Sequence, residues 1–158
     1  MTLRPITKAD DPVIAKVIRT VLAEFGADRP GFAWQDPELD QLSTVYHNDQ
    51  AQYLVIDSGG VVLGGAGFAP LKGGDGKTCE LQKMYLAVEA RGVGFGHSLI
   101  TDLMLRAKKA GYEYCYLETL EHMTAANKLY LDNGFEQLKE PLGDTGHGGC
   151  NRWYGRAL

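Results

Sequence analysis

Six residues between a predicted strand and a predicted helix constrain this chain more than any other segment: Arg91-Gly92-Val93-Gly94-Phe95-Gly96. The strand covers residues 79–88 and the helix covers residues 97–110, where apolar side chains recur every three or four positions. A strand that turns through glycines into a helix directs several backbone N–H groups at one point, and the helix dipole adds partial positive charge there. The segment therefore predicts a binding site for a phosphate or diphosphate group, with Arg91 supplying a full charge.

Other uses of a glycine-rich turn fit these residues less well. A P-loop needs Lys-Ser or Lys-Thr directly after its glycines, and the one such pair here, Lys77-Thr78, precedes a strand. A dinucleotide-binding fold needs G-x-G-x-x-G in its first strand-to-helix turn, with an acidic residue about 20 positions later. Glu118 lies at a suitable distance, but the spacing is G-x-G-x-G and the turn follows the midpoint of the chain. The alternative that this glycine-rich turn binds no ligand also remains.

Length and charge limit the broad class of the protein. The 158 residues and the 44% hydrophobic content suit one globular domain spanning residues 1–158. A formal net charge of −4 argues against general nucleic-acid binding, which needs a basic face. No apolar run approaches the roughly 18 residues that cross a bilayer, and the first residues lack the apolar stretch of a secretory leader. We therefore expect a cytoplasmic protein that binds neither nucleic acid nor membranes.

Cysteine and histidine give no sign of a metal site. Cys79, Cys115 and Cys150 are widely spaced and form no C-x-x-C pair, so we expect free thiols. The four histidines are scattered, and no two of them lie one helical turn apart. The sequence therefore predicts no metal ligands.

Periodicity and turn residues predict strands and helices along the whole chain. Strands are expected at residues 2–6, 52–57, 61–69, 79–88, 114–120, 135–138 and 152–158, and helices at 14–22, 38–47, 97–110 and 124–133. Ser58-Gly59-Gly60 predicts a tight hairpin, and Gly64, Gly65 and Gly67 predict a bulge or a close backbone approach in the next strand. This order predicts an α/β chain of the α+β type, with a mixed sheet of about six to seven strands and helices on both faces.

Several motifs together resemble one family. Arg91-x-x-Gly94-x-Gly96 resembles the [QR]-x-x-G-x-[GA] signature of the GNAT N-acetyltransferases, which bind acetyl-coenzyme A. Val88 stands where many relatives have proline, at a position where only backbone groups are expected to matter. Three further segments are similar to the family's preceding strand, its later helix and strand, and its first strand and turn: residues 80–86, Asn127-Lys128-Leu129-Tyr130 with Gly134-Phe135, and Leu3-Arg4 with Thr7 and Asp10.

The resemblance covers nearly the whole chain and implies a fold and an activity. The fold would be a GNAT-like, mostly antiparallel mixed sheet. The activity would be transfer of an acetyl group from acetyl-coenzyme A, the cosubstrate, to a primary amine by direct attack. A small-molecule acceptor is our first expectation, and a protein or peptide amine is the second. A non-catalytic sensor of acetyl-coenzyme A stays an alternative, and a homodimer is left open.

The resemblance also implies which residues bind the cosubstrate. Backbone amides of Arg91, Gly92, Val93, Gly94, Phe95 and Gly96 would surround the diphosphate. The pantetheine arm would lie along Leu86, Ala87 and Val88, and the Leu86 N–H would donate to the acetyl carbonyl. Asn127 would contact the arm or an active-site water, although a local hydrogen bond near the start of its helix is the plainer interpretation.

Tyr130 is the candidate acid, because the family's tyrosine at this place protonates the departing sulfur; a core tyrosine is the alternative. Glu80 is one candidate base. Strict alternation would put Glu80, Gln82, Met84 and Leu86 on one strand face, opposite Cys79, which disfavours an acetyl-cysteine route. Glu118 is the rival candidate for the base. A third alternative is that an ordered water molecule serves in place of a dedicated base.

Three aromatic residues precede the expected hairpin: Phe32, Trp34 and Tyr46. In the family this region covers the acceptor pocket. These rings would stack on the acceptor or seal the pocket, and the sequence does not decide between the two roles.

Overall fold

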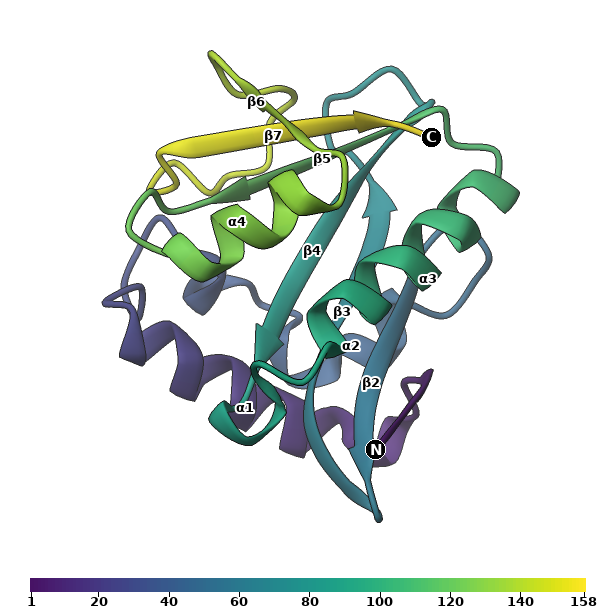
Figure 1. Cartoon of the computed structure of the whole chain (residues 1–158), viewed down its shortest axis with the longest axis vertical. Helices are drawn as coiled ribbons and strands as arrows, with labels where there is room; N and C mark the ends of the chain where they lie inside the picture. The colour runs from purple at the N-terminus through teal and green to yellow at the C-terminus, as the bar shows by residue number, and fades with distance from the viewer.

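The computed structural model describes all 158 residues and places seven strands in one sheet of order β1-β2-β3-β4-β5-β7-β6 (Figure 1). Strands β4 and β5 are parallel, and every other neighbouring pair is antiparallel. The strands are β1 (Thr2–Pro5), β2 (Gln52–Ser58), β3 (Val61–Pro70), β4 (Thr78–Leu86), β5 (Tyr114–Thr119), β6 (Glu136–Leu138) and β7 (Arg152–Ala157). The predicted mixed, mostly antiparallel sheet is confirmed.

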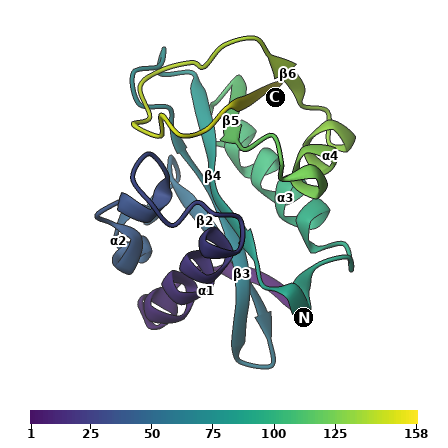
Figure 2. The same cartoon turned by 90° about the vertical axis from the view of Figure 1, so that its left-hand side faces the viewer.

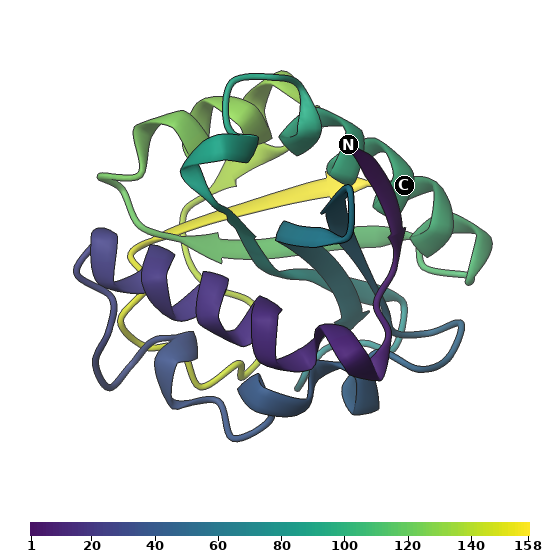
Figure 3. The same cartoon turned by 90° about the horizontal axis from the view of Figure 1, so that it is seen from below.

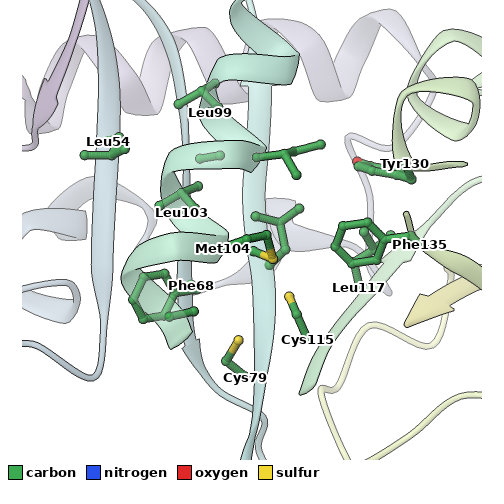
Figure 4. Close-up of a cluster of buried hydrophobic side chains, with 14 of the residues drawn as sticks. Leu54, Phe68, Cys79, Leu99, Leu103, Met104, Cys115, Leu117, Tyr130 and Phe135 are labelled. Atoms are coloured by element: carbon green, nitrogen blue, oxygen red, sulfur yellow. The ribbon is translucent and has the colours of Figure 1, made fainter. Parts of the chain in front are cut away.

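Helices cover both faces of the sheet, as predicted (Figures 2 and 3). Helices α1 (Asp11–Glu24) and α2 (Leu42–Val45) lie on one face, and α3 (Phe95–Lys109) and α4 (Thr124–Asp132) lie on the other. Alternation along β2 serves both layers, because Tyr53 and Val55 pack towards α1 whereas Leu54 and Ile56 pack towards α3. The α3 layer is the larger core, with 18 buried residues, and its centre is drawn in Figure 4.

The predicted helix over residues 38–47 is wrong in its extent. The chain instead forms a 3-10 turn at Leu39–Gln41 and the four-residue helix α2. The Asp11 carboxylate accepts hydrogen bonds from the backbone N–H of Ser43 (2.9 Å) and from its hydroxyl (2.6 Å), which ties this segment to α1. The local sequence, Ser43-Thr44-Val45, has weak helix propensity. The hydrogen bonds to Asp11 therefore determine the conformation of this segment.

The predicted hairpin is confirmed, because Gly59 and Gly60 both have positive φ between β2 and β3. The predicted irregularity in β3 is also confirmed, since its pairing with β2 passes from Val62 to Gly64 and leaves Leu63 as an extra residue. The register of β3 with β4 shifts as well, between Gly65 and Gly67. Across from this shift, Lys83 has a φ of 48°, in the left-handed region. One extra residue is therefore inserted into β4 at Lys83.

The bulge in β4 overturns the predicted alternation. Glu80 and Gln82 do share a face, but Met84 and Leu86 pack on the opposite, α3 side of the sheet. Tyr85 takes their place and packs on the α1 side. The reason is that an extra residue reverses the side-chain parity of everything after it.

Strands β4 and β5 separate soon after they begin. They pair only from Thr78 to Glu80 and from Tyr114 to Tyr116, after which the two strands diverge (Figure 1). Helix α4 lies over the opening between them (Figure 1). Strand β4 ends at Leu86 rather than at the predicted Val88, and a 3-10 turn at Val88–Ala90 leads towards α3. No helix is both long enough and apolar enough to cross a membrane.

Candidate active site

The glycine turn presents a row of unpaired backbone donors at the start of α3. Gly92 (φ 74°) and Gly94 (φ 95°) adopt the left-handed conformation that turns the chain into the helix. The prediction that the Arg91 amide is free is wrong, because its N–H donates to the Val88 carbonyl (3.2 Å). None of the six N–H groups that follow, from Gly92 to His97, donates to another backbone group. Such unpaired amides at the positive end of a helix dipole suit a phosphate or diphosphate.

The Arg91 side chain is held beside this turn. Its Nε donates to the Leu86 carbonyl (2.9 Å), and its Nη1 forms an ion pair with Glu24 of α1 (2.7 Å). The guanidinium also lies over the Phe25 ring, 5.9 Å from the centroid. These contacts fix the end of β4 relative to α1, so Arg91 shapes the site as well as adding charge to it.

A groove of about 340 Å³ runs from the glycine turn towards the opening between β4 and β5. Arg91, Gly94 and His97 line one end, and Leu129 and Tyr130 of α4 line the other. A Cβ on Gly96 would lie 2.7 Å from Leu129 Cδ2, so a glycine here lets α3 and α4 approach closely. The groove is polar at the helix start and apolar along the remainder, which matches a charged ligand with a long uncharged arm.

The three predicted arm-binding residues fall in two places. Leu86 lines the groove. Ala87 and Val88 line a separate neighbouring pocket beside α1, and Val88 is 69% exposed. The Ala87 N–H already donates to the Leu63 carbonyl (2.8 Å).

Asn127 is buried and bonded within the protein. Its Nδ2 donates to the carbonyls of Leu120 (2.9 Å) and Met123 (2.7 Å). Its Oδ1 accepts a hydrogen bond from the Tyr154 hydroxyl (2.7 Å). Asn127 lines neither this groove nor the second cavity described below. Its hydrogen bonds hold the start of α4 against β7.

Tyr130 sits where the groove meets a second cavity, and it lines both. Only 7% of the residue is exposed, and its ring packs against Phe135 and Tyr154 at the edge of the core (Figure 4). Its hydroxyl forms no hydrogen bond with the protein; since no fully buried side-chain polar atom lacks a partner, this hydroxyl faces open space. Burial raises the pKa of Tyr130, so the phenol stays protonated and can donate at neutral pH.

The second cavity, of about 80 Å³, lies beyond Tyr130 between β4, β5 and α1. Glu80 is 5% exposed there and accepts one hydrogen bond, from Gln82 Nε2 (2.7 Å). Burial raises the pKa of Glu80 to about 7; the Gln82 bond opposes the rise and the charge of Glu118 adds to it. Glu80 can therefore hold or release a proton near neutral pH.

Glu118 lies beside Glu80 but is bonded differently. Its two oxygens accept hydrogen bonds from the hydroxyls of Tyr116 (2.7 Å) and Thr145. The carboxylates of Glu80 and Glu118 and a ring nitrogen of His147 lie within 4.8 Å of one another. The two rival bases are thus brought together in one cavity, in an arrangement that suits a cation.

A partly buried ion-pair cluster lies at the far side of this cavity. Asp36 accepts from Lys83 Nζ (2.6 Å) and pairs with His147 Nε2 (2.9 Å). Burial acts to raise the pKa of Asp36, but these two partners outweigh it and hold the pKa below its usual value. The hydrogen bond to Asp36 in turn raises the pKa of His147.

The sequence alone missed several residues that line this cavity or contact its lining side chains. Asp36, Lys83, Thr145, His147 and Cys150 come from separated loops and from the bulge, and no spacing pattern links them. Gly149 shows how the last loop reaches the site: its N–H donates to the Gly31 carbonyl (2.9 Å), and a Cβ there would strike the Phe32 ring. The glycine-rich stretch 143–149 is the sequence signal that could have indicated this loop.

Of the three aromatic residues expected over the pocket, Phe32 lines the cavity. Tyr46 lies behind Gln82 and donates to its Oε1 (2.6 Å). Trp34 is 36% exposed and does not line the cavity.

A groove with unpaired backbone amides at one end, joined at Tyr130 to a pocket that holds two carboxylates, suits an enzyme that moves a group from a phosphorylated carrier onto a second substrate. The acetyltransferase (GNAT) family model matches residues 18–135. The uncharacterized N-acetyltransferase YjgM of Escherichia coli is 43% identical over 150 residues, covering 94% of this chain and 89% of that protein. The chain belongs to the GNAT family and is an acetyl-coenzyme A-dependent N-acetyltransferase, which confirms the predicted class and cosubstrate.

Solved structures share the fold. An acetyltransferase of the GNAT family from Staphylococcus aureus superposes with a TM-score of 0.82 at 22% identity, covering 99% of this chain and 98% of that one. A second, yncA of Salmonella typhimurium with its cofactor acetyl-CoA, superposes with a TM-score of 0.78 at 22% identity, covering 99% and 93%.

Proposed function

We propose that this enzyme transfers the acetyl group of acetyl-coenzyme A directly to the primary amine of a small molecule held in the Glu80 cavity. The diphosphate would bind the free N–H groups from Gly92 to His97. The pantetheine arm would follow the apolar groove past Leu86 to Tyr130. The acceptor would enter from the other side, so that amine and thioester meet at Tyr130.

The position of Tyr130 carries this proposal. Its hydroxyl has no partner in the protein, and its residue lines both the cosubstrate groove and the acceptor cavity. A tyrosine that served only the core would need no contact with either space. A protonated phenol at this junction can donate to the sulfur as the C–S bond breaks.

Glu80 is the better candidate for the base, and Glu118 for a fixed negative charge. Glu80 has one hydrogen-bonded oxygen and a pKa of about 7. Both oxygens of Glu118, in contrast, already accept hydrogen bonds from hydroxyl groups. The acceptor would arrive as an ammonium ion and lose a proton to Glu80. Its nitrogen then bonds to the acetyl carbon, the C–S bond breaks, and Tyr130 gives its proton to the sulfur, so that coenzyme A leaves as a thiol. The second proton of the nitrogen then passes to the Tyr130 oxygen, which leaves a neutral amide and restores the phenol, and Glu80 releases its proton to water.

The small size of the cavity favours a small acceptor over a protein. Its open volume is about 80 Å³, and its walls include Phe32, Leu120 and Met123. A peptide N-terminus remains the second candidate, since only its first residue would need to enter.

The test is release of coenzyme A thiol with purified protein, acetyl-coenzyme A and a panel of amines, amino acids and peptides. Tyr130→Phe should lower kcat about 100-fold, in the range expected for a lost general acid. Its coenzyme A affinity and thermal unfolding should stay unchanged, because the missing hydroxyl bonds nothing in the protein. Tyr114→Phe, away from both cavities, is the matched control.

A sensor would release no thiol above the hydrolysis background with any acceptor. That result, or full activity in Tyr130→Phe, would contradict the proposed function. Release with peptides alone would move the acceptor from small molecules to proteins.

A further inference from the structure

A second phenol lies where the groove and the acceptor cavity meet. Six residues line both spaces: Val21, Phe25, Met84, Tyr85, Met123 and Tyr130. Four of these side chains are apolar, so the hydroxyls of Tyr85 and Tyr130 are the only side-chain donors in the set. His147 and Cys150 line the acceptor cavity but not the groove. The reaction proposed above uses Tyr130 and leaves Tyr85 without a role.

The bulge in β4 directs Tyr85 to this junction. Strict alternation would place Tyr85 with Leu81, which packs on the α3 side of the sheet. The extra residue at Lys83 reverses the parity and turns Tyr85 to the α1 side. A φ of 48° is unfavourable for lysine, and such strained backbone is typical of functional sites. The position of Tyr85 therefore depends on a conformation that the fold maintains at a cost.

The Tyr85 hydroxyl is free to donate a hydrogen bond. It has no partner in the protein, and since no fully buried side-chain polar atom lacks a partner, it faces open space. Burial raises the pKa of Tyr85 above its usual value, and the nearby Cys150 and Tyr130 raise it further. The phenol therefore keeps its proton at neutral pH and acts as a donor, not as a base.

Resting on the proposed function, we infer that Tyr85 is a second catalytic residue, whose hydroxyl donates a hydrogen bond to the carbonyl oxygen of the acetyl group. Two atoms of the thioester gain negative charge during the reaction: the oxygen as the C–N bond forms, and the sulfur as the C–S bond breaks. Tyr130, on α4, serves the sulfur. Tyr85, on β4, is the other side-chain donor at the junction, so it serves the oxygen.

Tyr85 keeps its own proton throughout the reaction. As the nitrogen lone pair forms the C–N bond, the π electron pair of the carbonyl moves onto the oxygen, where the O–H of Tyr85 stabilises it. When the C–S bond breaks, that pair returns and the carbonyl of the amide forms. Tyr85 thus needs no group that takes up or returns its proton, in agreement with its lack of a hydrogen bond to the protein.

Tyr85→Phe tests this role because it removes only the hydroxyl. With acetyl-coenzyme A and the fastest acceptor of the amine panel, kcat should fall about 100-fold, as expected for a lost donor to the oxygen. Coenzyme A affinity and the unfolding temperature should stay unchanged, since the hydroxyl bonds nothing in the protein. Tyr114→Phe, away from both spaces, is the matched control and should keep full activity.

The infrared carbonyl band of bound acetyl-coenzyme A, isotope-labelled at the carbonyl carbon, identifies the atom that Tyr85 contacts. A hydrogen bond to the oxygen weakens the C=O bond, so the band should lie at lower wavenumber in the wild type than in Tyr85→Phe. Tyr130→Phe and Tyr114→Phe should leave the band at its wild-type position. The spectrum is recorded without an acceptor, so it does not depend on which amine reacts.

The outcomes separate this inference from the proposed function. Full activity in Tyr85→Phe overturns the inference and leaves the acetyltransferase reaction standing. So does a carbonyl band that Tyr85→Phe does not move, or moves no further than Tyr130→Phe does. A lower unfolding temperature in Tyr85→Phe also overturns it, because the hydroxyl would then stabilise the fold. If no acceptor gives thiol release, the proposed function fails, and the carbonyl band alone decides whether Tyr85 contacts the acetyl group.

Discussion

The proposed cosubstrate groove and the proposed acceptor cavity meet at Tyr130, but their polar groups come from different parts of the chain. The groove takes its polar end from consecutive backbone groups, Gly92 to His97, at the start of one helix. The cavity takes its polar groups from side chains on β4, β5 and two loops, and its Asp36–His147 contact joins residues 111 positions apart. Backbone donors recognise a diphosphate whatever side chains surround them, whereas separated side chains set which acceptor fits.

Glu80→Gln should produce the largest effect, and only on the acceptor side. We expect kcat/KM to fall about 100-fold at pH 8, because the amide cannot take the ammonium proton. In the wild type, kcat/KM should rise with pH through about 7 as Glu80 ionises, and the variant should lack that step. A pH profile of thiol release measures both, and an unchanged inflection near pH 7 in the variant would assign it to another group.

The same substitution should stabilise the fold at high pH. Burial raises the pKa of Glu80 from 4.5 to about 7, so the folded state holds this proton more tightly than the unfolded chain. The resulting stability is present below pH 4.5 and is lost as the pH rises through 7. Glu80→Gln should therefore gain up to about 3 kcal/mol over the wild type at pH 8 and little at pH 4.5, as measured by denaturant unfolding. If the wild type and Glu80→Gln had the same free energy of unfolding at both pH values, burial would not destabilise the ionised form of Glu80.

Gly94→Ala should produce the next effect, on the groove alone. Alanine at a φ of 95° costs about 1–2 kcal/mol, and relaxing that strain would move the N–H groups of the turn. We expect coenzyme A affinity to fall about tenfold, with the KM of the acceptor unchanged. Val93→Ala is the matched control; the Val93 side chain is 62% exposed, so only its backbone should matter and affinity should hold. Weaker binding in Val93→Ala would make side chains, and not the backbone, the basis of recognition.

His147→Ala should produce the smallest effect, again on the acceptor side. It removes one partner of Asp36 but leaves Lys83 bonded to it, so the cavity should loosen without collapsing. We expect the acceptor KM to rise about threefold to fivefold, while calorimetry finds coenzyme A affinity unchanged. A loss of coenzyme A binding in this variant would mean that the two sites are not built independently.

The same contrast explains how much the sequence could predict. The groove was predictable because its signal is contiguous: a strand, a glycine turn and an amphipathic helix occur within residues 79–110. The cavity was predictable only in its two carboxylates, and their shared position depends on the divergence of β4 and β5. Alternation predicted the faces of β4 correctly up to Gln82 and wrongly after it, because a bulge leaves no mark in residue periodicity. His147 and Asp36 depend on long-range loop packing, which no local pattern encodes.

Isothermal titration calorimetry with coenzyme A and with pantetheine tests the central claim most directly. The two ligands share the thiol-bearing arm, but only coenzyme A carries the diphosphate that the amides from Gly92 to His97 would bind. We predict 1:1 binding of coenzyme A and affinity at least about 100-fold weaker for pantetheine. Equal affinity for the two, or no heat with coenzyme A from protein freed of bound nucleotide, would contradict the account.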